Sequence, residues 1–331
     1  MGNIKIIMNG CTKIDKPLIS ILMAVYEPRM DWLKQQLDSL EAQTYPNLKL
    51  YIRDDFSSDV SFTEIQECVQ KSIHSFPYVI KRNKKNLGSN GTFEQLTLEA
   101  EGEYFAYCDQ DDIWLPEKLE TLIREITRAN GLLACSDMYV IDGDGRLCAD
   151  SISKIRRRHI FQSGREKVLK TLLTRNFVTG CTMLIDASTA KAAIPFLPEM
   201  VHDHWLAVVA SARGTVISVL KPLIRYRIHG GNQTGILVGV SCRADYIHLR
   251  VIGFAKQINH ISERLPGIDD AEHVRQWANA RVDFALGKEW KAAIRLWRLR
   301  KQNRLTTFFE LLTMRLPEPV FCQLIRLIKG F

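Results

Sequence analysis

Closely spaced cysteines are missing from this chain of 331 residues. None of its eight cysteines forms a C-x-x-C pair, and they are scattered along the whole sequence. Disulfide-rich secreted domains and zinc ribbons need closer spacing, so both classes are excluded. We therefore expect reduced thiols and a cytoplasmic location. The cysteines are Cys11, Cys68, Cys108, Cys135, Cys148, Cys181, Cys242 and Cys322.

A long hydrophobic run is also absent. The longest one, residues 18–26, is about half as long as a membrane-spanning helix requires. The N-terminus carries lysines and an aspartate, and it has no apolar run of the length found in signal peptides. The sequence therefore predicts neither a leader peptide nor a transmembrane segment.

A basic stripe along the whole protein is missing as well. The net charge is +8, but residues 236–331 alone hold +7 of it. Nucleic-acid-binding proteins are expected to show such a stripe, so nucleic acid is excluded as a partner. The composition that remains, 46% hydrophobic and 25% charged residues, is typical of an ordinary folded protein.

Short apolar segments alternate with amphipathic ones in the first half of the chain. Residues 18–25 are uniformly apolar, which is typical of a central strand covered on both sides. This alternation predicts an α/β fold, a sheet with helices on both faces. Further strands are expected at residues 49–53, 78–80, 103–108, 132–135, 138–141, 181–185, 215–220 and 223–226. Helices are expected around Leu33–Leu40, Phe62–Val69 and Leu119–Ile126, after an N-cap at Asn90, and at 205–212.

After residue 235 no strand pattern recurs, and the sequence predicts several helices rich in Arg, Leu and Trp. We therefore expect two regions, 1–237 and 238–331. From residue 281 to the end there are 11 basic and 4 acidic residues, interleaved with aromatic and aliphatic ones. A basic amphipathic helix is typical of an element that lies on an anionic membrane surface. A helical cap that packs on the first region, or on a second subunit in a homodimer, remains an equal alternative.

Two acidic clusters directly follow expected strands. Asp54 and Asp55 come after the second strand, and Asp109, Asp111 and Asp112 come after the fourth. Ligands of open α/β sheets bind at the carboxyl ends of the strands. Carboxylates this close repel one another unless a cation is present. Asp109 and Asp111 are therefore interpreted as ligands of a divalent cation, Mg²⁺ or Mn²⁺, which also holds a diphosphate.

These motifs together carry a family resemblance. In order, the chain has Met23-Ala24-Val25-Tyr26, Asp54-Asp55 with Ser57-Ser58-Asp59, Asn86-Leu87-Gly88 and Asp109-Gln110-Asp111-Asp112-Ile113-Trp114. The series resembles the GT-A glycosyltransferases of family 2, and within them the bacterial rhamnosyltransferases of cell-wall and O-antigen synthesis. The resemblance covers residues 18–235. It implies the GT-A fold, a mixed sheet flanked by helices, followed here by a C-terminal helical extension.

The resemblance also implies site residues. Asp109 and Asp111 match the D-x-D motif, with Asp111 on the metal and Asp109 on the ribose or the metal. His229 matches a late histidine that contacts the metal or the diphosphate. Asp203, in His202-Asp203-His204-Trp205, matches the base that deprotonates the acceptor. Its place at a helix start should keep it ionised and make it a weaker base. The residues matched to donor binding are Ala24, Tyr26, Glu27, Asp54, Asp55, Asn86, Gly88 and Asp109.

The activity implied is an inverting, non-processive transfer of a sugar, with L-rhamnose from dTDP-rhamnose as the leading donor and another dTDP- or UDP-sugar as the alternative. The implied acceptor is a hydroxyl of a cell-surface polysaccharide or a lipid-linked saccharide, reached at the inner face of the cell membrane. No Q-x-x-R-W motif follows, which argues against a processive polymerase. A metal-dependent phosphoryl-transfer enzyme and a non-catalytic sugar-nucleotide-binding scaffold are the remaining alternatives.

Overall fold

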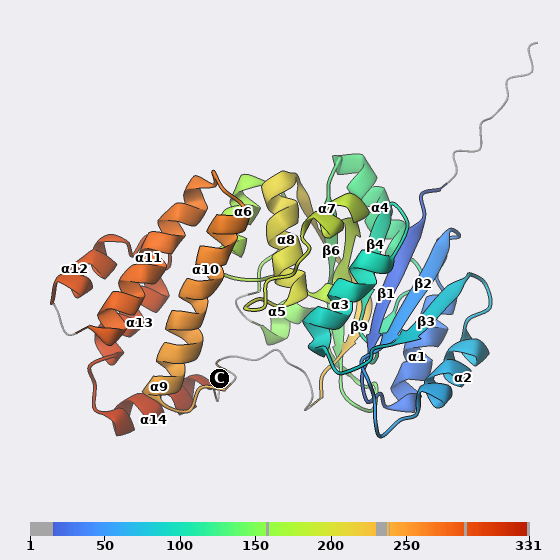
Figure 1. Ribbon diagram of the computed structural model, residues 1–331, viewed down its shortest axis with the longest axis horizontal. Coiled ribbons are helices and arrows are strands. Elements are labelled where there is room, and N and C mark those ends of the chain that lie inside the picture. Colours follow the sequence, from blue (N-terminus) through green and yellow to red (C-terminus); the bar gives the residue numbers. More distant parts are fainter. Residues whose placement is uncertain (1–15, 157–158, 230–236, 238, 288–289, 330–331) are drawn as a thin grey trace, which may run out of the picture.

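The computed structural model describes residues 16–156, 159–229, 237, 239–287 and 290–329. Figure 1 shows a sheet with its helices on one side of the molecule and a stack of helices from the C-terminal part on the other. The expectation of no leader peptide concerns residues that lie outside this description. The predicted boundary at residue 237 adjoins residues 230–236 and 238, which lie outside it as well.

One mixed sheet of nine strands forms the centre, in the order β3-β2-β1-β4-β8-β6-β9-β5, and β7 pairs with β6. Strands β1 to β4 are parallel, whereas β8 runs antiparallel to both β4 and β6. The strands are β1 Ile19–Val25, β2 Leu48–Asp54, β3 Tyr78–Arg82, β4 Tyr104–Cys108, β5 Ile113–Trp114, β6 Leu133–Ile141, β7 Leu147–Ala149, β8 Met183–Asp186 and β9 Val216–Arg227.

Helices cover both faces of the sheet, as the alternation in the sequence predicts. Successive side chains of a strand point to opposite faces. In β1, Ile19, Ile21 and Met23 join one core layer with α1 and α4, and Leu22 joins the other with α3 and α8. The helices of this part are α1 Met30–Glu41, α2 Phe62–Ser72, α3 Gly88–Glu99, α4 Lys118–Ala129, α5 Ile152–Ile155, α6 Glu166–Leu172, α7 Ala187–Ala192 and α8 His202–Arg213.

The C-terminal part is helical from Arg243 onward among the described residues, as predicted. It packs on the second core layer through Tyr246, Ile258 and Trp277. Arg264 donates hydrogen bonds to the carbonyls of Ala193, Ile194 and Pro195, so the two parts also share polar contacts. The helices are α9 Arg243–Tyr246, a π-helical segment Ile247–Ile252, α10 Gly253–Arg264, α11 Asp269–Leu286, α12 Trp290–Arg298, α13 Arg304–Thr313 and α14 Glu318–Lys329.

Three predictions about these elements were wrong. Residues 132–135 and 138–141 belong to one strand, β6, and the two last predicted strands are one strand, β9. In both cases the pairing register shifts, so that Asp137 and Pro222 sit at a bulge where the apolar pattern is interrupted. Asn90 is not an N-cap, because α3 begins at Gly88. Across the described residues, none of the helices is long and apolar enough to cross a bilayer.

Candidate active site

The carboxyl ends of β1, β2 and β4 meet at one edge of the sheet because these strands are parallel neighbours. Backbone contacts fix the segments that follow them. The Asp55 amide donates to the Val25 carbonyl at 2.7 Å. The Gln110 side chain accepts from the Tyr26 amide at 2.8 Å and donates to the Tyr26 carbonyl at 2.9 Å. Gln110, which the sequence analysis did not single out, thus binds the end of β1 to the D-x-D segment.

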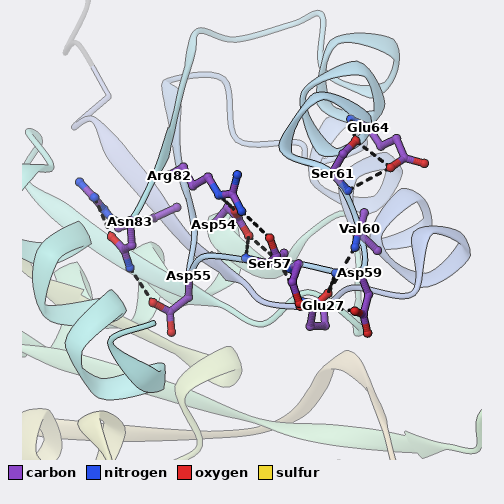
Figure 2. A network of polar contacts seen from close by, with 12 residues as sticks. Glu27, Asp54, Asp55, Ser57, Asp59, Val60, Ser61, Glu64, Arg82 and Asn83 are labelled. Atoms are coloured by element: carbon purple, nitrogen blue, oxygen red, sulfur yellow. Dashed lines mark hydrogen bonds and ion pairs between the residues drawn. The ribbon is translucent and has the colours of Figure 1, made fainter. Parts of the chain in front are cut away.

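The cluster after β2 is hydrogen-bonded within the protein (Figure 2). Asp54 is fully buried; it accepts from the Ser57 hydroxyl at 2.5 Å and from the Ser57 amide at 3.2 Å, and it pairs with Arg82 at 3.1 Å. Asp55 accepts from the Asn83 amide group and from the Leu87 backbone, each at 2.7 Å, through one oxygen. Its other oxygen points away from this network in Figure 2. Asp54 therefore holds the loop, whereas Asp55 keeps one oxygen for a ligand.

Glu27 organises the same loop from the side of β1. Its carboxylate accepts from the backbone amides of Ser58, Asp59 and Val60 at 2.6, 3.0 and 3.3 Å. The Ser58 backbone hydrogen bond is the leading cause of the lowered pKa of Glu27. Figure 2 shows Glu27 pointing into the loop. A carboxylate occupied in this way positions the loop that a nucleoside would meet.

The other residues predicted for donor binding lie around this edge. Tyr26 is half exposed and Ala24 is partly buried. The Asn86 side chain accepts from the Gly88 amide at 3.0 Å, at the start of α3. Gly88 has φ +71°, a backbone conformation that side chains with a Cβ rarely adopt. The Leu87 amide, which donates to Asp55, fixes this loop beside the end of β2.

The carboxylates after β4 lie close to one another with the Lys118 ammonium nearby, whereas Asp54 after β2 pairs with Arg82. Burial, together with the charges of Asp111 and Asp203, raises the pKa of Asp109 to about 7. Burial also raises the pKa of Asp112 well above its ordinary value, with Asp111 and Asp109 adding to the shift. Asp112 accepts from the Arg227 amide at 2.9 Å. The carboxyl groups at this point of the sheet edge thus hold their protons more tightly than ordinary aspartates do.

Asp111 and His229 are brought together, as predicted for the metal-binding residues. The His229 Nε2 atom lies 2.7 Å from an Asp111 carboxylate oxygen, and both side chains are partly exposed. Arg227 contacts the backbone beside this pair. Its Nε donates to the Asp111 carbonyl at 2.8 Å, and its guanidinium carbon lies 5.0 Å from the centre of the Trp32 ring. The Trp32 ring also packs against the His229 ring. Arg227 is a positioning residue that the sequence analysis did not identify.

Lys118 is a fully buried cation next to the acidic cluster, and it too was missed. Its ammonium group donates to the Cys181 carbonyl at 2.6 Å and lies 2.9 Å from the centre of the Trp114 ring. Burial lowers the pKa of Lys118 to about 7, and Cys181, Cys108 and Asp112 act in the opposite direction. Nothing in the local sequence marks it, because lysine on an amphipathic helix ordinarily faces water.

Asp203 lies in the first turn of α8, and 9% of its surface is exposed. One of its oxygens accepts from the Asn176 side chain and the other from the Gly180 amide, each at 3.0 Å. A Cβ at residue 180 would come within 2.6 Å of the His202 ring, so this close approach needs glycine. The helix start was expected to keep Asp203 strongly acidic. Burial instead raises the pKa of Asp203 to about 6, which makes it a better base.

The histidines beside Asp203 are buried and pack within the protein. His202 packs 4.1 Å from the Phe93 ring, and burial lowers its pKa to about 3. His204 lies 2.6 Å from the Leu172 carbonyl, and burial lowers its pKa to about 4. Asn90 accepts from the His202 amide at 2.8 Å and donates to the Met200 carbonyl. Asn90 therefore ties α3 to the start of the helix that carries Asp203.

The acidic cluster has the donor chemistry for a hard divalent cation. Ligand atoms of Asp109, Asp112 and Cys181 lie within 4.8 Å of one another. Burial raises the pKa of the Cys181 thiol well above its usual range, so it stays protonated and is a poor ligand for Mg²⁺. Asp109 thus groups with Asp112, whereas the predicted ligands Asp111 and His229 form a separate pair 2.7 Å apart. Carboxylate oxygens and an imidazole nitrogen are donors of the kind that Mg²⁺ or Mn²⁺ binds, so the chemistry of these residues fits a divalent cation.

Comparisons with known proteins agree with this geometry. The family "Glycosyl transferase family 2" matches residues 20–191, about half of the chain. An uncharacterised glycosyltransferase of Methanocaldococcus jannaschii, MJ1057, is 29% identical over 41% of this chain and 46% of its own length. The dTDP-rhamnosyl transferase RfbG of Shigella flexneri is 24% identical over 85% of this chain and 95% of its own length.

Solved structures confirm the predicted fold. The crystal structure of S. aureus TarS 1–349 in complex with UDP-GlcNAc superposes with a TM-score of 0.60 at 14% identity, over 94% of this chain and 89% of TarS 1–349. The same fragment in complex with UDP gives a TM-score of 0.59. The mixed sheet flanked by helices is therefore the GT-A fold, with the C-terminal helical extension that was expected. This chain belongs to glycosyltransferase family 2.

Proposed function

We propose that the protein is an inverting, non-processive glycosyltransferase that uses a nucleoside-diphosphate sugar and a divalent cation. The proposal depends most on one observation: the adjacent residues Gly180 and Cys181 contact both acidic centres. The Gly180 amide donates to Asp203 at 3.0 Å, and ligand atoms of Cys181, Asp109 and Asp112 lie within 4.8 Å of one another. This supports a common site for the candidate base and the D-x-D motif, which are 94 positions apart in sequence.

The two acidic centres would act on opposite sides of the anomeric carbon of the sugar, one on the acceptor that attacks and one on the diphosphate that leaves. Asp203 accepts the proton of the acceptor hydroxyl as its oxygen attacks the sugar, because each of its oxygens keeps a lone pair beyond its hydrogen bond to Asn176 or Gly180. A cation held by Asp109, Asp111 and His229 would neutralise the charge that develops on the leaving diphosphate. Asp55 and the loop held by Glu27 orient the nucleoside.

A single displacement inverts the anomeric centre, and this site supports one. It needs a base on the acceptor and a neutralised leaving group. A retaining double displacement would in addition need a side-chain nucleophile against the sugar. Asp203 is hydrogen-bonded by the Gly180 amide and the Asn176 side chain, which hold it in place to take up a proton. The inverting course follows from this assignment.

The donor proposed is dTDP-L-rhamnose. It is supported by the similarity to RfbG of Shigella flexneri, named a dTDP-rhamnosyl transferase, which extends over 85% of this chain and beyond the segment that defines the family. Another dTDP- or UDP-sugar is the alternative donor. The acceptor proposed is a hydroxyl of a cell-surface polysaccharide or of a lipid-linked saccharide, presented on the cytoplasmic side of the cell membrane.

We also propose that residues 1–237 form the catalytic unit and that 238–331 form a basic helical unit attached to it. All nine strands end by Arg227, and every predicted site residue precedes residue 230. Membership of family 2 leaves no support for the phosphoryl-transfer alternative. A scaffold that binds sugar nucleotides without turnover remains to be separated by experiment.

The experiment is a panel of nucleotide sugars, first in thermal shift and then in an assay of nucleoside diphosphate release with and without acceptor and Mn²⁺. A bound donor present at 100 times its Kd would stabilise the protein by about 2.7 kcal/mol. We expect dTDP-rhamnose to give the largest shift, and release to require both acceptor and Mn²⁺. Binding without any release would favour the scaffold, and full release in excess chelator would contradict the metal-dependent mechanism.

A further inference from the structure

Two short helices of the C-terminal part present a continuous apolar surface. Trp290, Ile294 and Trp297 are spaced at 4 and 3 positions on α12, so they share one side of the helix. On α13, exposed apolar side chains follow the same kind of spacing. We call these six residues the α12–α13 face: Trp290, Ile294, Trp297, Leu305, Phe308 and Leu312.

The two halves of the α12–α13 face are joined. The Trp297 and Phe308 rings pack edge to face, with their centres 5.3 Å apart. The opposite sides of the helices are already used, because Leu296 and Thr307 are fully buried in the protein. The apolar face is therefore left over after internal packing. Exposure is large at its edges: 69% for Trp290 and 71% for Leu312.

Positive charge surrounds the α12–α13 face. Residues 290–315 contain seven Lys and Arg side chains and one acidic residue, Glu310. Glu310 is buried and paired with Arg281, so it contributes no negative charge to the surface. Arg295 pairs with Asp283, but within the described part of the chain Lys291, Arg298, Lys301 and Arg304 form no ion pair. A large apolar patch with a cationic rim matches a surface that is apolar inside and anionic outside.

The location of the face suits contact with a large flat partner. In Figure 1, α12 and α13 lie at the end of the molecule remote from β2 and β3. Two of its six residues, Trp290 and Trp297, are tryptophans, and tryptophan side chains prefer the level of the lipid headgroups. No described helix is long and apolar enough to enter a bilayer as a span, so contact would be made from one side.

We propose that the α12–α13 face docks on an anionic lipid leaflet, with its apolar side chains between the headgroups and its cations on lipid phosphates. Each Lys or Arg near such a leaflet strengthens binding about fivefold. The proposal does not depend on the sugar donor or on catalysis, because none of the six residues or the surrounding cations belongs to the candidate active site.

The test is co-sedimentation of the full chain with vesicles. Vesicles of phosphatidylglycerol and phosphatidylcholine in equal parts are compared with vesicles of phosphatidylcholine alone, at low and high salt. We expect binding to the anionic vesicles that weakens as salt is added. Removing two charges in Arg298→Gln/Lys301→Gln should weaken this binding about thirtyfold. The matched control, Lys167→Gln/Lys191→Gln, removes the same charge from exposed sites elsewhere and should bind nearly as the unchanged protein does.

A second pair of variants tests the apolar part. Leu305→Ser/Leu312→Ser should reduce partitioning about tenfold or more. Leu98→Ser/Leu220→Ser alters two leucines of similar exposure outside the face and should not. Unchanged unfolding temperatures would show that all the variants fold.

Three results would overturn the proposal. The first is that the unchanged chain does not bind anionic vesicles, and the second is that each control variant loses as much vesicle binding as its test variant. The third is a dimer in sedimentation equilibrium that Leu305→Ser/Leu312→Ser dissociates. The last result would assign the α12–α13 face to a second copy of the chain.

Discussion

The two acidic clusters look alike in sequence and differ in the folded protein. Both follow a buried parallel strand, and both reach the same edge of the sheet. After β2, Asp54 is matched by Ser57 and Arg82 (Figure 2). After β4, Asp109 and Asp112 lie beside each other with raised pKa values. Acidic residues at a strand end can therefore either fix a loop or bind a ligand. Which of the two they do depends on whether neighbouring protein groups already pair with their carboxylates.

The difference assigns roles to the clusters. The carboxylates of Asp54 and Glu27 accept hydrogen bonds from the loop after β2. These two residues therefore position the loop beside the proposed nucleoside site. In the proposed mechanism the β4 cluster holds the cation that faces the diphosphate. Asp203 is the proposed base, and the Gly180–Cys181 segment links it to that cluster. The predictions below test this contrast.

The largest effect is expected for Asp203→Asn. The amide cannot accept a proton from the acceptor, so turnover should fall by about 10²–10⁴-fold. Donor affinity should stay nearly unchanged, because Asn keeps the shape of the side chain. Steady-state kinetics together with calorimetric donor binding would measure both quantities. Near-normal turnover would remove Asp203 from the mechanism.

Asp54→Asn should act on stability rather than on chemistry. The amide would lose the charge opposite Arg82. If its oxygen stays on Ser57, its NH2 group, a donor, must face the Arg82 guanidinium, which is itself a donor. We expect a decrease of about 1–3 kcal/mol in the free energy of unfolding. Urea denaturation would measure it, with the exposed Asp59→Asn as a matched control. Equal stability of the two variants would mean that the β2 cluster does not hold the loop.

Acidification should slow the reaction. The pKa of Asp203 is about 6, and only its ionised form can act as a base. The kcat/KM value should therefore fall about tenfold for each pH unit below about 6 and level off above it. The residual activity of Asp203→Asn should lack this limb of the profile. A limb that persists in the variant would assign the titration to another group.

Asp109→Asn should stabilise the protein at pH 8 in the presence of chelator. The pKa of Asp109 is raised to about 7, so the stability that this group contributes is present at low pH and is lost as the pH rises through about 7. Asn carries no charge and avoids that loss. We expect a gain on the order of 1 kcal/mol at pH 8 and a smaller one at pH 5. A loss of stability at pH 8 would contradict the account of unbalanced charge.

The sequence predicted the elements whose pattern is local. The apolar run at 18–25 and the helical spacing of Leu33, Leu37 and Leu40 correspond to β1 and α1. Periodicity failed where a strand bulges, as at Pro222, because the bulge breaks the alternation without ending the strand.

The site was predictable where chemistry follows a motif and hidden where it depends on tertiary packing. The acidic residues and His229 stand in recognisable series. Lys118 and Arg227 are buried basic residues next to them. The local sequence around a buried lysine or arginine does not differ from that around an exposed one. The acidity expected of Asp203 from its helix start was wrong for a related reason: burial, which only the fold determines, outweighs the helix dipole.

The most direct test of the contrast between the clusters is a calorimetric titration of Mn²⁺, with a nucleoside diphosphate present, into the unchanged chain, Asp111→Asn and Asp54→Asn. The account predicts that Asp111→Asn weakens Mn²⁺ binding at least about tenfold, whereas Asp54→Asn, kept below its unfolding temperature, binds nearly as the unchanged protein does. Equal affinity in Asp111→Asn, or a larger loss in Asp54→Asn, would contradict it.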